Sequence, residues 1–502
     1  MTVTVATPKV QDHLGFRMKL AEIRRGIFLP KYYNPENTAR LAELEHTHEL
    51  ITLGDLIKKK HISVSTGDEI GKMAYGTGTI PFVRTSDVSN GELKTDAKQG
   101  VSDAIYADYG PSQDVQAGDI LFVRDGTYLI GQVALVTESD LPLLYQSHLL
   151  KFRVADDSPV SPWLLLACLG APIVKRQIRA RQFTADIIDT IGGRFGELVL
   201  PIPRSAGVAS RIEQEVKDLV AERSRLRDKI RKIPYWVEGF IDTLDEPLPA
   251  DAVSDVVENG NPGFVRPISE LRNGIMMPKY YDPQLEEAVR ALEPSHRLIS
   301  LGKLVKDGAV SWDTGIEVGK MVYGTGDVPF IRTSDISNWQ LKGDPKQNVS
   351  EDVYQSNLQD VRAGDIFVVR DGTYLVGTSC ILTEDDIKIL YCGGLYKLRV
   401  EKPEVVDPYL LLALLNAPTV RRQMRAKQFT RDIIDTLGKR LFEVVLPFPR
   451  DHAISARIAE ETRTTIETRA RLRDRLKEIA FEIEGIARGA AADDPESSED
   501  VL

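Results

Sequence analysis

The chain contains one long unit twice. PKYYNP at Pro30 returns as PKYYDP at Pro278, and GKMAYGTG at Gly71 returns as GKMVYGTG at Gly319. After a two-residue deletion near Tyr109, the match continues into the trailing segment of each copy. Because each copy is about 230 residues long, the pattern indicates duplication of a whole domain rather than a short stacked repeat.

Within each copy the pattern changes from mixed to helical. Short apolar runs between Gly, Asp and Asn turn signals predict strands over 50–155. A leucine-rich stretch that starts with a proline and ends in basic residues predicts one helix over 162–181, and 208–230 predicts a long helix. We therefore expect an α/β (α+β) fold with two homologous domains, each followed by a long helix.

The expected divisions follow from these patterns and from the charge distribution. They are an N-terminal arm (1–15), a first α/β domain (16–205), a central helical spacer (206–240), an acidic linker (241–263), a second α/β domain (264–451), a distal helical spacer (452–488) and an acidic tail (489–502).

Both long helices carry an incomplete heptad of apolar residues. The stripe residues expected to bind a partner helix are Ile212, Leu219, Leu226, Ile458, Leu472 and Ile479, and Arg223 interrupts the first stripe. Pairing of the two helices as an antiparallel coiled coil would bury both stripes and place the domains at opposite ends of a rod. A rod of 23–30 residues is roughly 35–45 Å long, close to the ~34–36 Å of one duplex turn.

Composition places the chain among ordinary globular proteins. It has 502 residues, of which 42% are hydrophobic and 27% charged. Its three cysteines form no CxxC or Cys/His cluster, which argues against a structural zinc. Without an apolar run long enough for a bilayer or a signal-peptide pattern at Met1, we expect a cytoplasmic protein with no membrane partner.

The net charge of −10 does not exclude a nucleic-acid partner. Residues 242–258 carry six acidic side chains and 489–502 carry five, and neither segment contains Lys or Arg. Without these eleven charges the remainder is at +1, so a basic face on the folded domains is compatible with the composition.

Catalytic signatures are missing from the sequence. GDEIGKM at Gly67 is not a Walker A motif, and GTGTIP at Gly76 lacks the third glycine of a dinucleotide-binding loop. There is no GxSxG, no HExxH and no Asn/Asp-Pro-Pro-aromatic motif. We therefore expect no catalytic residue, no metal site and no cofactor in this chain.

Polar and basic residues in turn-rich places, present in both copies, are the candidates for DNA contact. Arg can bind guanine or phosphate, and Lys, Tyr, Thr, Ser and Gln can bind phosphate oxygens or base edges. In the first copy the candidates are Lys72, Tyr75, Thr77, Arg84, Thr85, Ser86, Arg124, Thr127, Tyr128, Gln146, His148, Arg176, Arg179, Arg181 and Gln182. In the second copy they are Lys320, Tyr323, Thr325, Arg332, Thr333, Ser334, Arg370, Thr373, Tyr374, Arg421, Arg422, Arg425, Lys427 and Gln428.

Each candidate group also has a structural explanation. The glycine-rich loop at Gly76 can be a plain hairpin connection, and Arg84 can pair with Asp87 to support a turn. Arg124 and its neighbour Asp125 can form an ion pair within a turn. The basic residues near position 181 can simply complement the negative end of a helix dipole.

The copies differ at one informative place. Tyr145-Gln146-Ser147-His148 aligns with Tyr391-Cys392-Gly393-Gly394 between similar flanks. If these residues face DNA, the two halves recognise partly different bases; otherwise the difference is neutral.

The ordered set of motifs resembles the specificity subunit of type I restriction-modification systems. PFVRTSDV at Pro81, GDILFVRDGTYLIG at Gly118, the leucine-rich helix with a basic end, LPIP at Leu200 and a long helix occur in this order, twice, over roughly 16–485. Such subunits carry two target-recognition domains, each followed by a helical spacer.

The resemblance implies a phage-defence function without catalysis by this chain. Each domain would bind one half of a bipartite double-stranded DNA site, and the paired helices would set the spacer. Two copies of an adenine-N6 methyltransferase subunit would dock and would themselves bind S-adenosylmethionine. In a complete system ATP-dependent restriction subunits would join.

One departure from the family pattern changes the expected site. Target-recognition domains within one subunit commonly differ, whereas PFVRTSDVSN at Pro81 and PFIRTSDISN at Pro329 share eight of ten residues. Similar domains related by a two-fold predict similar half-sites, hence a near-palindromic bipartite site. Two alternatives stay open: a stand-alone enzyme that acts on DNA, and a specificity or scaffold protein of a defence system that does not methylate.

Overall fold

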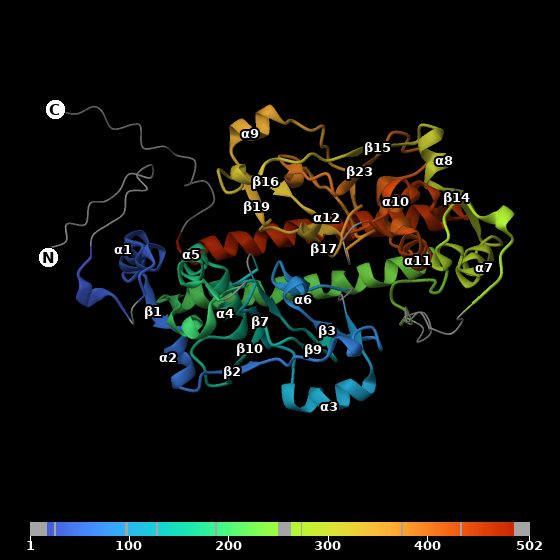
Figure 1. Cartoon of the computed structure of the whole chain (residues 1–502). Helices are drawn as coiled ribbons and strands as arrows, with labels where there is room; N and C mark the ends of the chain where they lie inside the picture. Colours follow the sequence, from blue (N-terminus) through green and yellow to red (C-terminus); the bar gives the residue numbers. More distant parts are fainter. Residues whose placement is uncertain are drawn as a thin grey trace.

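A computed structural model shows two similar domains on either side of two long antiparallel helices (Figure 1). It describes residues 18–24, 27–95, 99–126, 129–185, 188–248, 263–272, 274–372, 375–431 and 434–485. The expected N-terminal arm (1–15) and acidic tail (489–502) lie outside these residues, as does 249–262 of the acidic linker.

In its described residues the first domain combines five short α-helices with thirteen strands. Its helices are α1 (Pro35–Leu44), α2 (Leu53–Lys58), α3 (Asp103–Gln113), α4 (Pro162–Gly170) and α5 (Pro172–Arg181). Its strands are β1 (His48–Thr52), β2 (Ile62–Thr66), β3 (Ile80–Val83), β4 (Val88–Ser89), β5 (Glu92–Leu93), β6 (Gly100–Val101), β7 (Ile120–Val123), β8 (Val133–Leu135), β9 (Leu144–Tyr145), β10 (Leu149–Val154), β11 (Phe183–Ala185), β12 (Ile188–Thr190) and β13 (Val199–Pro203).

The second domain repeats this order. Its helices are α7 (Pro283–Ala291), α8 (Leu301–Lys306), α9 (Glu351–Ser356), α10 (Pro408–Leu415) and α11 (Pro418–Lys427). Its strands are β14 (His296–Ser300), β15 (Val310–Thr314), β16 (Val328–Ile331), β17 (Ile336–Ser337), β18 (Gln340–Leu341), β19 (Gln347–Val349), β20 (Ile366–Val369), β21 (Ser379–Ile381), β22 (Leu390–Tyr391), β23 (Leu395–Val400), β24 (Phe429–Arg431), β25 (Ile434–Thr436) and β26 (Val445–Pro449).

Small sheets form the centre of each domain. In the first domain β2-β10-β7-β8 make an antiparallel sheet. A second, mixed sheet, β6-β3-β9, has β3 antiparallel to β6 and parallel to β9. All four residues of β7 are buried, because the sheet is covered on both faces, one of them by the apolar α4. The second domain has the same orders, β15-β23-β20-β21 and β19-β16-β22. The mixed helix-and-strand fold predicted from the sequence is confirmed.

The single helix expected over 162–181 is wrong: the structure has two helices. α4 ends at Gly170 and α5 begins at Pro172, with Ala171 in an extended conformation between them. Proline lacks the N–H that would continue the helix and disfavours helical geometry in the residue before it. Pro418 separates α10 from α11 in the same way.

The two long helices are α6 (Ala206–Val237) and α12 (His452–Glu482). With 32 and 31 residues they are each about 47 Å long, slightly longer than the sequence predicted. They begin at side-chain caps, since Ser205 Oγ accepts from Val208 N (3.4 Å) and Asp451 Oδ1 from Ala453 N (2.7 Å).

The long helices pack antiparallel and contribute to both domain cores. Ile212 and Leu219 of α6 share the core of the first domain with Ile479 near the end of α12. Ile458, near the start of α12, lies in the core of the second domain with Ile230 of α6. The six predicted stripe residues (Ile212, Leu219, Leu226, Ile458, Leu472 and Ile479) are buried or half-buried inside the chain. They therefore leave little surface for another subunit, which would need to bind other residues of the helices.

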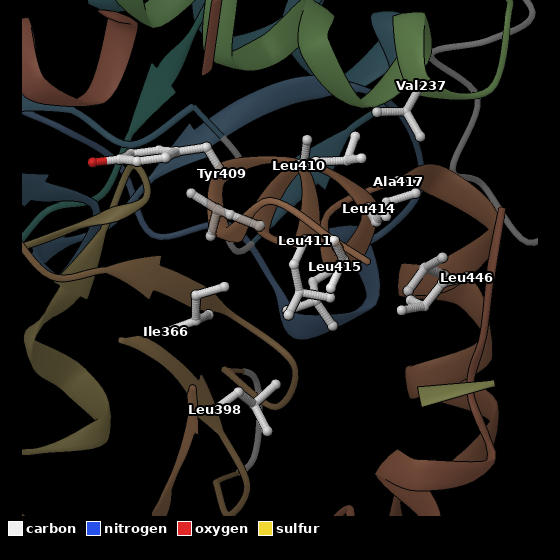
Figure 2. Packing of buried hydrophobic residues seen from close by; sticks show 14 of the residues in the cluster. Val237, Ile366, Leu398, Tyr409, Leu410, Leu411, Leu414, Leu415, Ala417 and Leu446 are labelled. Atoms are coloured by element: carbon white, nitrogen blue, oxygen red, sulfur yellow. The ribbon is translucent and has the colours of Figure 1, made fainter. Parts of the chain in front are cut away.

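Each long helix ends on the domain to which it does not belong in sequence. At the end of α6, Glu238 Oε1 accepts from the backbone N–H of Thr419, in the first turn of α11 (2.8 Å). At the end of α12, Glu484 accepts in the same way from the N–H of Ile173 in α5. Figure 2 shows Val237, beside Glu238 in sequence, next to Leu410 and Leu414 of α10 in the second core.

The domains also meet directly through two hairpins. β4 pairs with β5 and β17 with β18, and the two hairpins exchange equivalent hydrogen bonds. Gly343 N donates to Asn90 Oδ1, and Thr95 N donates to Asn338 Oδ1, both at 2.8 Å. These reciprocal contacts, with those of Glu238 and Glu484, define a two-fold pseudosymmetry whose axis passes between the hairpins.

Candidate nucleic-acid interface

A hollow of about 1340 Å³ crosses the pseudo-two-fold axis. It is lined by both domains and by the second half of α6, and we call it the interdomain groove. Five predicted DNA-contact residues line it: Ser86, Ser334, Arg421, Arg425 and Gln428.

Cations outnumber carboxylates along the interdomain groove. The seven basic residues of the lining are Lys94, Arg231, Lys232, Lys342, Lys346, Arg421 and Arg425; the five acidic ones are Asp87, Asp140, Asp228, Asp335 and Asp344. Three of these carboxylates pair with basic side chains: Asp140 with Arg227 (2.7 Å), Asp344 with Lys175 (3.2 Å) and Asp228 with Lys232 of the groove itself (3.1 Å). The groove is thus suited to an anionic ligand.

A patch of polar side chains lies where strands end in the first domain. β3 and β9 are parallel and in register, with Val83 opposite Tyr145, so the residues that follow them, Arg84 and Gln146, are neighbours. Arg84 Nε donates to Gln146 Oε1 at 3.4 Å. The guanidinium of Arg84 also lies 5.8 Å from the ring centre of Tyr75. Three residues from distant parts of the sequence therefore converge on one patch.

Asp125 organises the neighbouring part of this patch. Its carboxylate accepts from Arg124 Nη2 (2.8 Å) and Thr190 Oγ1 (2.5 Å), and it lies 2.9 Å from His148 Nδ1. Burial would raise the pKa of Asp125, but these hydrogen bonds hold it below its ordinary value. The Arg124–Asp125 ion pair that the sequence allowed as a structural role is therefore present. The same carboxylate fixes the orientation of Arg124 and His148.

The corresponding patch of the second domain is less polar. Arg370 donates to Asp371 (2.6 Å) and lies over the ring of Tyr396 (5.6 Å). Cys392 replaces Gln146, and its burial raises the pKa of its thiol. With Gly394 in place of His148, this domain has no side chain at that position. The two patches thus share an arginine and differ in the side chains beside it.

In the turns that follow β3 and β16, an aspartate carboxylate accepts from the backbone N–H of the arginine three residues earlier. Asp87 accepts from the backbone N–H of Arg84 (2.9 Å), and Asp335 accepts from Arg332 N in the same way (2.9 Å). The guanidinium of Arg84 also contacts Gln146 and Tyr75 of the polar patch. In these turns Thr85 and Thr333 are half-buried, whereas Ser86 and Ser334 are exposed.

The two glycine-rich loops contain both structural and exposed residues. Thr77 donates to Ala74 O (2.8 Å) and accepts from Ser102 N (3.1 Å), so it closes the loop. Thr325 repeats both bonds, with Val322 O (2.7 Å) and Ser350 N (3.1 Å). Tyr75 and Tyr323 pack on Phe82 and Phe330. Lys72 and Lys320 are exposed, so a ligand can reach them.

The basic helix ends divide into structural and exposed residues. Arg181 lies 3.5 Å from Glu197, and Lys427 lies 3.3 Å from Glu443. Arg176 is exposed and lies 3.7 Å from Glu484 at the end of α12. Gln182 and Gln428 donate to Asp189 (3.5 Å) and Asp435 (3.2 Å). Of the remainder, Arg179 and Arg425 are exposed, and Arg421 and Arg422 are half-buried.

Four predicted contact residues lie outside the described part of the chain: Thr127, Tyr128, Thr373 and Tyr374. They belong to the loops after β7 and β20, whose described neighbours Gly126 and Leu375 line the interdomain groove.

The sequence prediction missed a buried charge cluster under the hairpins. Glu92 of β5 accepts from Arg469 of α12 and lies 3.2 Å from Arg223 of α6. Burial alone would raise the pKa of Glu92, but the two guanidinium groups hold it well below its usual range. The interruption of the apolar stripe by Arg223, repeated as Arg469 in the second copy, was the signal for this cluster.

The described residues contain no group of three or more His, Cys, Asp or Glu side chains placed to hold a metal ion. None of their helices combines the length and apolar character that crossing a membrane requires.

No protein-family model and no curated relative matches the chain. Solved structures do match. One is the S subunit of a type I restriction-modification system from M. genitalium, with 13% identity, a TM-score of 0.30 and coverage of 86% of this chain and 96% of that one. Another is the HsdS subunit from Thermoanaerobacter tengcongensis, with 16% identity, a TM-score of 0.26 and coverage of 87% and 95%. Both of these structures are S subunits of type I restriction-modification systems.

Proposed function

We propose that this chain is the non-catalytic DNA sequence-specificity subunit of a type I restriction-modification or related phage-defence complex. The observation that carries the proposal is the two-fold relation between two homologous domains, each with a polar patch at its strand ends, across a groove with excess positive charge. A duplex has two-fold axes of its own, so two such domains can bind two half-sites of one DNA molecule.

The anchoring of both long helices at both ends supports a bipartite site with a fixed spacer. Each helix starts in its own domain and ends by capping α11 or α5 of the other domain through Glu238 or Glu484. The distance between the polar patches therefore depends on both helix lengths together. Because the domains are similar but differ at Gln146 and His148, the two half-sites should be similar but not identical. The whole site should therefore be near-palindromic.

The pseudosymmetry also supports two copies of one partner. A two-fold arrangement presents nearly the same surface twice, which suits two adenine-N6 methyltransferase subunits that bind S-adenosylmethionine themselves. ATP-dependent restriction subunits would join in a complete system. Under this proposal the chain acts on genomic DNA in the cytoplasm and binds no cofactor of its own.

Selection from a library of randomised duplexes by the purified full chain tests the proposal. We expect enrichment of one site with two short specified segments and an unspecified spacer, and binding that weakens steeply with salt. DNA cleavage or methylation by the chain alone would instead make it an enzyme. Absent or salt-insensitive DNA binding would make it a protein scaffold.

A further inference from the structure

One lysine from each copy lines the interdomain groove at equivalent positions. Lys94 follows the β4–β5 hairpin and Lys342 follows the β17–β18 hairpin, and both line the groove. Their backbones are fixed alike: Lys94 N donates to Asp87 O (2.9 Å) and Lys342 N donates to Asp335 O (2.8 Å). They are therefore equivalent under the pseudosymmetry and lie one on each side of its axis.

These lysines are held close to each other. The residue after each lysine joins the two hairpins. Gly343 N donates to Asn90, and Thr95 N donates to Asn338. Burial lowers the pKa of Lys342, Asp335 opposes this shift, and the charge of Lys94 adds to it. Because both lysines line one groove, an anion in the groove can contact both ammonium groups.

We propose that Lys94 and Lys342 bind the two symmetry-related phosphates at the centre of the DNA spacer, one on each strand. This inference rests on the proposed function and adds a third contact region between the two half-sites. When the protein axis and the duplex axis coincide, the phosphates nearest the axis come in pairs, one from each strand, as the lysines do.

The chemistry of this contact predicts affinity without sequence information. A lysine ammonium is a compact point charge that binds phosphate oxygens without reading a base edge. The spacer would thus be held tightly although its bases are unspecified. Lys346, which also lines the groove, would add to the positive field; its counterpart Lys98 lies outside the described residues.

The test compares two lysine pairs in the full chain. The test variant is Lys94→Met with Lys342→Met. The matched control is Lys58→Met with Lys306→Met, an equivalent pair in exposed positions at the ends of α2 and α8, outside the groove lining. A third variant, Lys94→Arg with Lys342→Arg, keeps both charges, and thermal unfolding of each variant checks that the fold is retained.

The probe is a duplex with the site selected by the chain, either unmodified or with neutral methylphosphonate linkages placed symmetrically about the spacer centre. For the test variant we expect the slope of log K against log salt to fall by about 1.8, since each phosphate contact contributes about 0.9. Discrimination between correct and mutated half-sites should not change. Neutral central linkages should weaken the wild type, the control and the arginine variant, and leave the methionine variant unaffected.

The outcomes separate this inference from the proposed function. Selection of a bipartite site together with an unchanged salt slope in the folded methionine variant would overturn the lysine contact alone. A changed base preference would also overturn it, because it would make the lysines sequence-reading residues. Failure to select any bipartite site would overturn both proposals.

Discussion

Glu92 and Gln340 occupy equivalent positions on the two hairpins, yet only Glu92 is charged, and it alone neutralises the equivalent arginines Arg223 and Arg469. Gln340 instead donates to the Ile466 carbonyl of α12 (3.4 Å). The centre of the molecule is thus symmetric in shape and asymmetric in charge. One carboxylate joins both long helices to the contact between the domains.

Replacement of Glu92 by glutamine should destabilise the protein strongly. The variant Glu92→Gln keeps the shape and leaves two buried guanidinium groups without a carboxylate, a change that typically costs about 3–5 kcal/mol. The exchange variant Glu92→Gln with Gln340→Glu should recover a large part of this loss, because the pseudosymmetry returns the carboxylate to the same pair of arginines. Denaturant unfolding measures both effects. An exchange variant as unstable as the single variant would contradict the equivalence of the two positions.

The contribution of Glu92 should depend on pH in a defined direction. Its pKa in the folded protein lies below the ordinary value of 4.5, so its stabilising effect is complete above that value and is lost as the pH falls below it. The difference in unfolding free energy between wild type and Glu92→Gln should therefore be constant from pH 6 to 8 and shrink below about pH 4.5. Unfolding titrations of both proteins measure it. A difference that persists undiminished at pH 3 would exclude this ion cluster as the cause.

Loss of one helix cap should loosen one domain only. In Glu238→Ala the N–H and hydroxyl of Thr419 lose their acceptor, at a cost of about 0.5–2 kcal/mol. Hydrogen exchange should speed up in the first turn of α11 and stay unchanged in the first turn of α5. The matched variant Glu484→Ala should give the reverse pattern. Equal changes at both helices in either variant would show that the caps do not act locally.

The difference between the polar patches should determine the difference between the half-sites. We expect the variant Gln146→Cys/Ser147→Gly/His148→Gly to convert the first half-site toward the second, with a change of about 1–3 kcal/mol for each altered base contact. The site should then approach a perfect palindrome, which selection from randomised duplexes would reveal. Gly393 and Gly394, already present in the second copy, show that the fold accepts these residues. An unchanged first half-site would place base recognition elsewhere.

The length of the DNA spacer should change only when both long helices are lengthened. An insertion of seven residues, two helical turns, near Leu226 in α6 and a matching insertion near Leu472 in α12 should lengthen the spacer by a fixed number of base pairs and keep both half-sites. An insertion in α6 alone should strain the caps at Glu238 and Glu484, and so lower stability rather than move the domains apart. A longer spacer from the single insertion would contradict the two-ended anchoring.

The sequence predicted the duplication, the mixed fold and the paired helices, because each depends on local patterns or on the repeat itself. It predicted a single helix where Pro172 makes two, although proline inside a helical pattern is a known stop signal. Contacts between segments that are distant in the sequence could not be predicted from it. No local pattern places Glu92 beside Arg469, or joins Glu238 to Thr419, because these contacts depend on how the domains are arranged around the helix pair.

The structure brings some candidate residues together and places others beside carboxylates. Arg84 and Gln146 lie side by side because they follow β3 and β9, which run parallel in one sheet. Arg124 follows β7 of the other sheet and pairs with Asp125. Arg181 and Lys427 turned out to lie beside the carboxylates of Glu197 and Glu443, which the basic pattern alone could not reveal. The lysine pair Lys94 and Lys342 was missed because only the meeting of the two hairpins brings these residues together.

A genome-wide map of adenine methylation, compared between cells with and without this gene, tests the central claim most directly. The account predicts that loss of the gene removes methylation from one motif, with two similar half-sites and a spacer of fixed length. A lost motif with two unrelated half-sites would contradict the role of the pseudosymmetry. An unchanged map in cells that express the chain with its methyltransferase partner would contradict the specificity function itself.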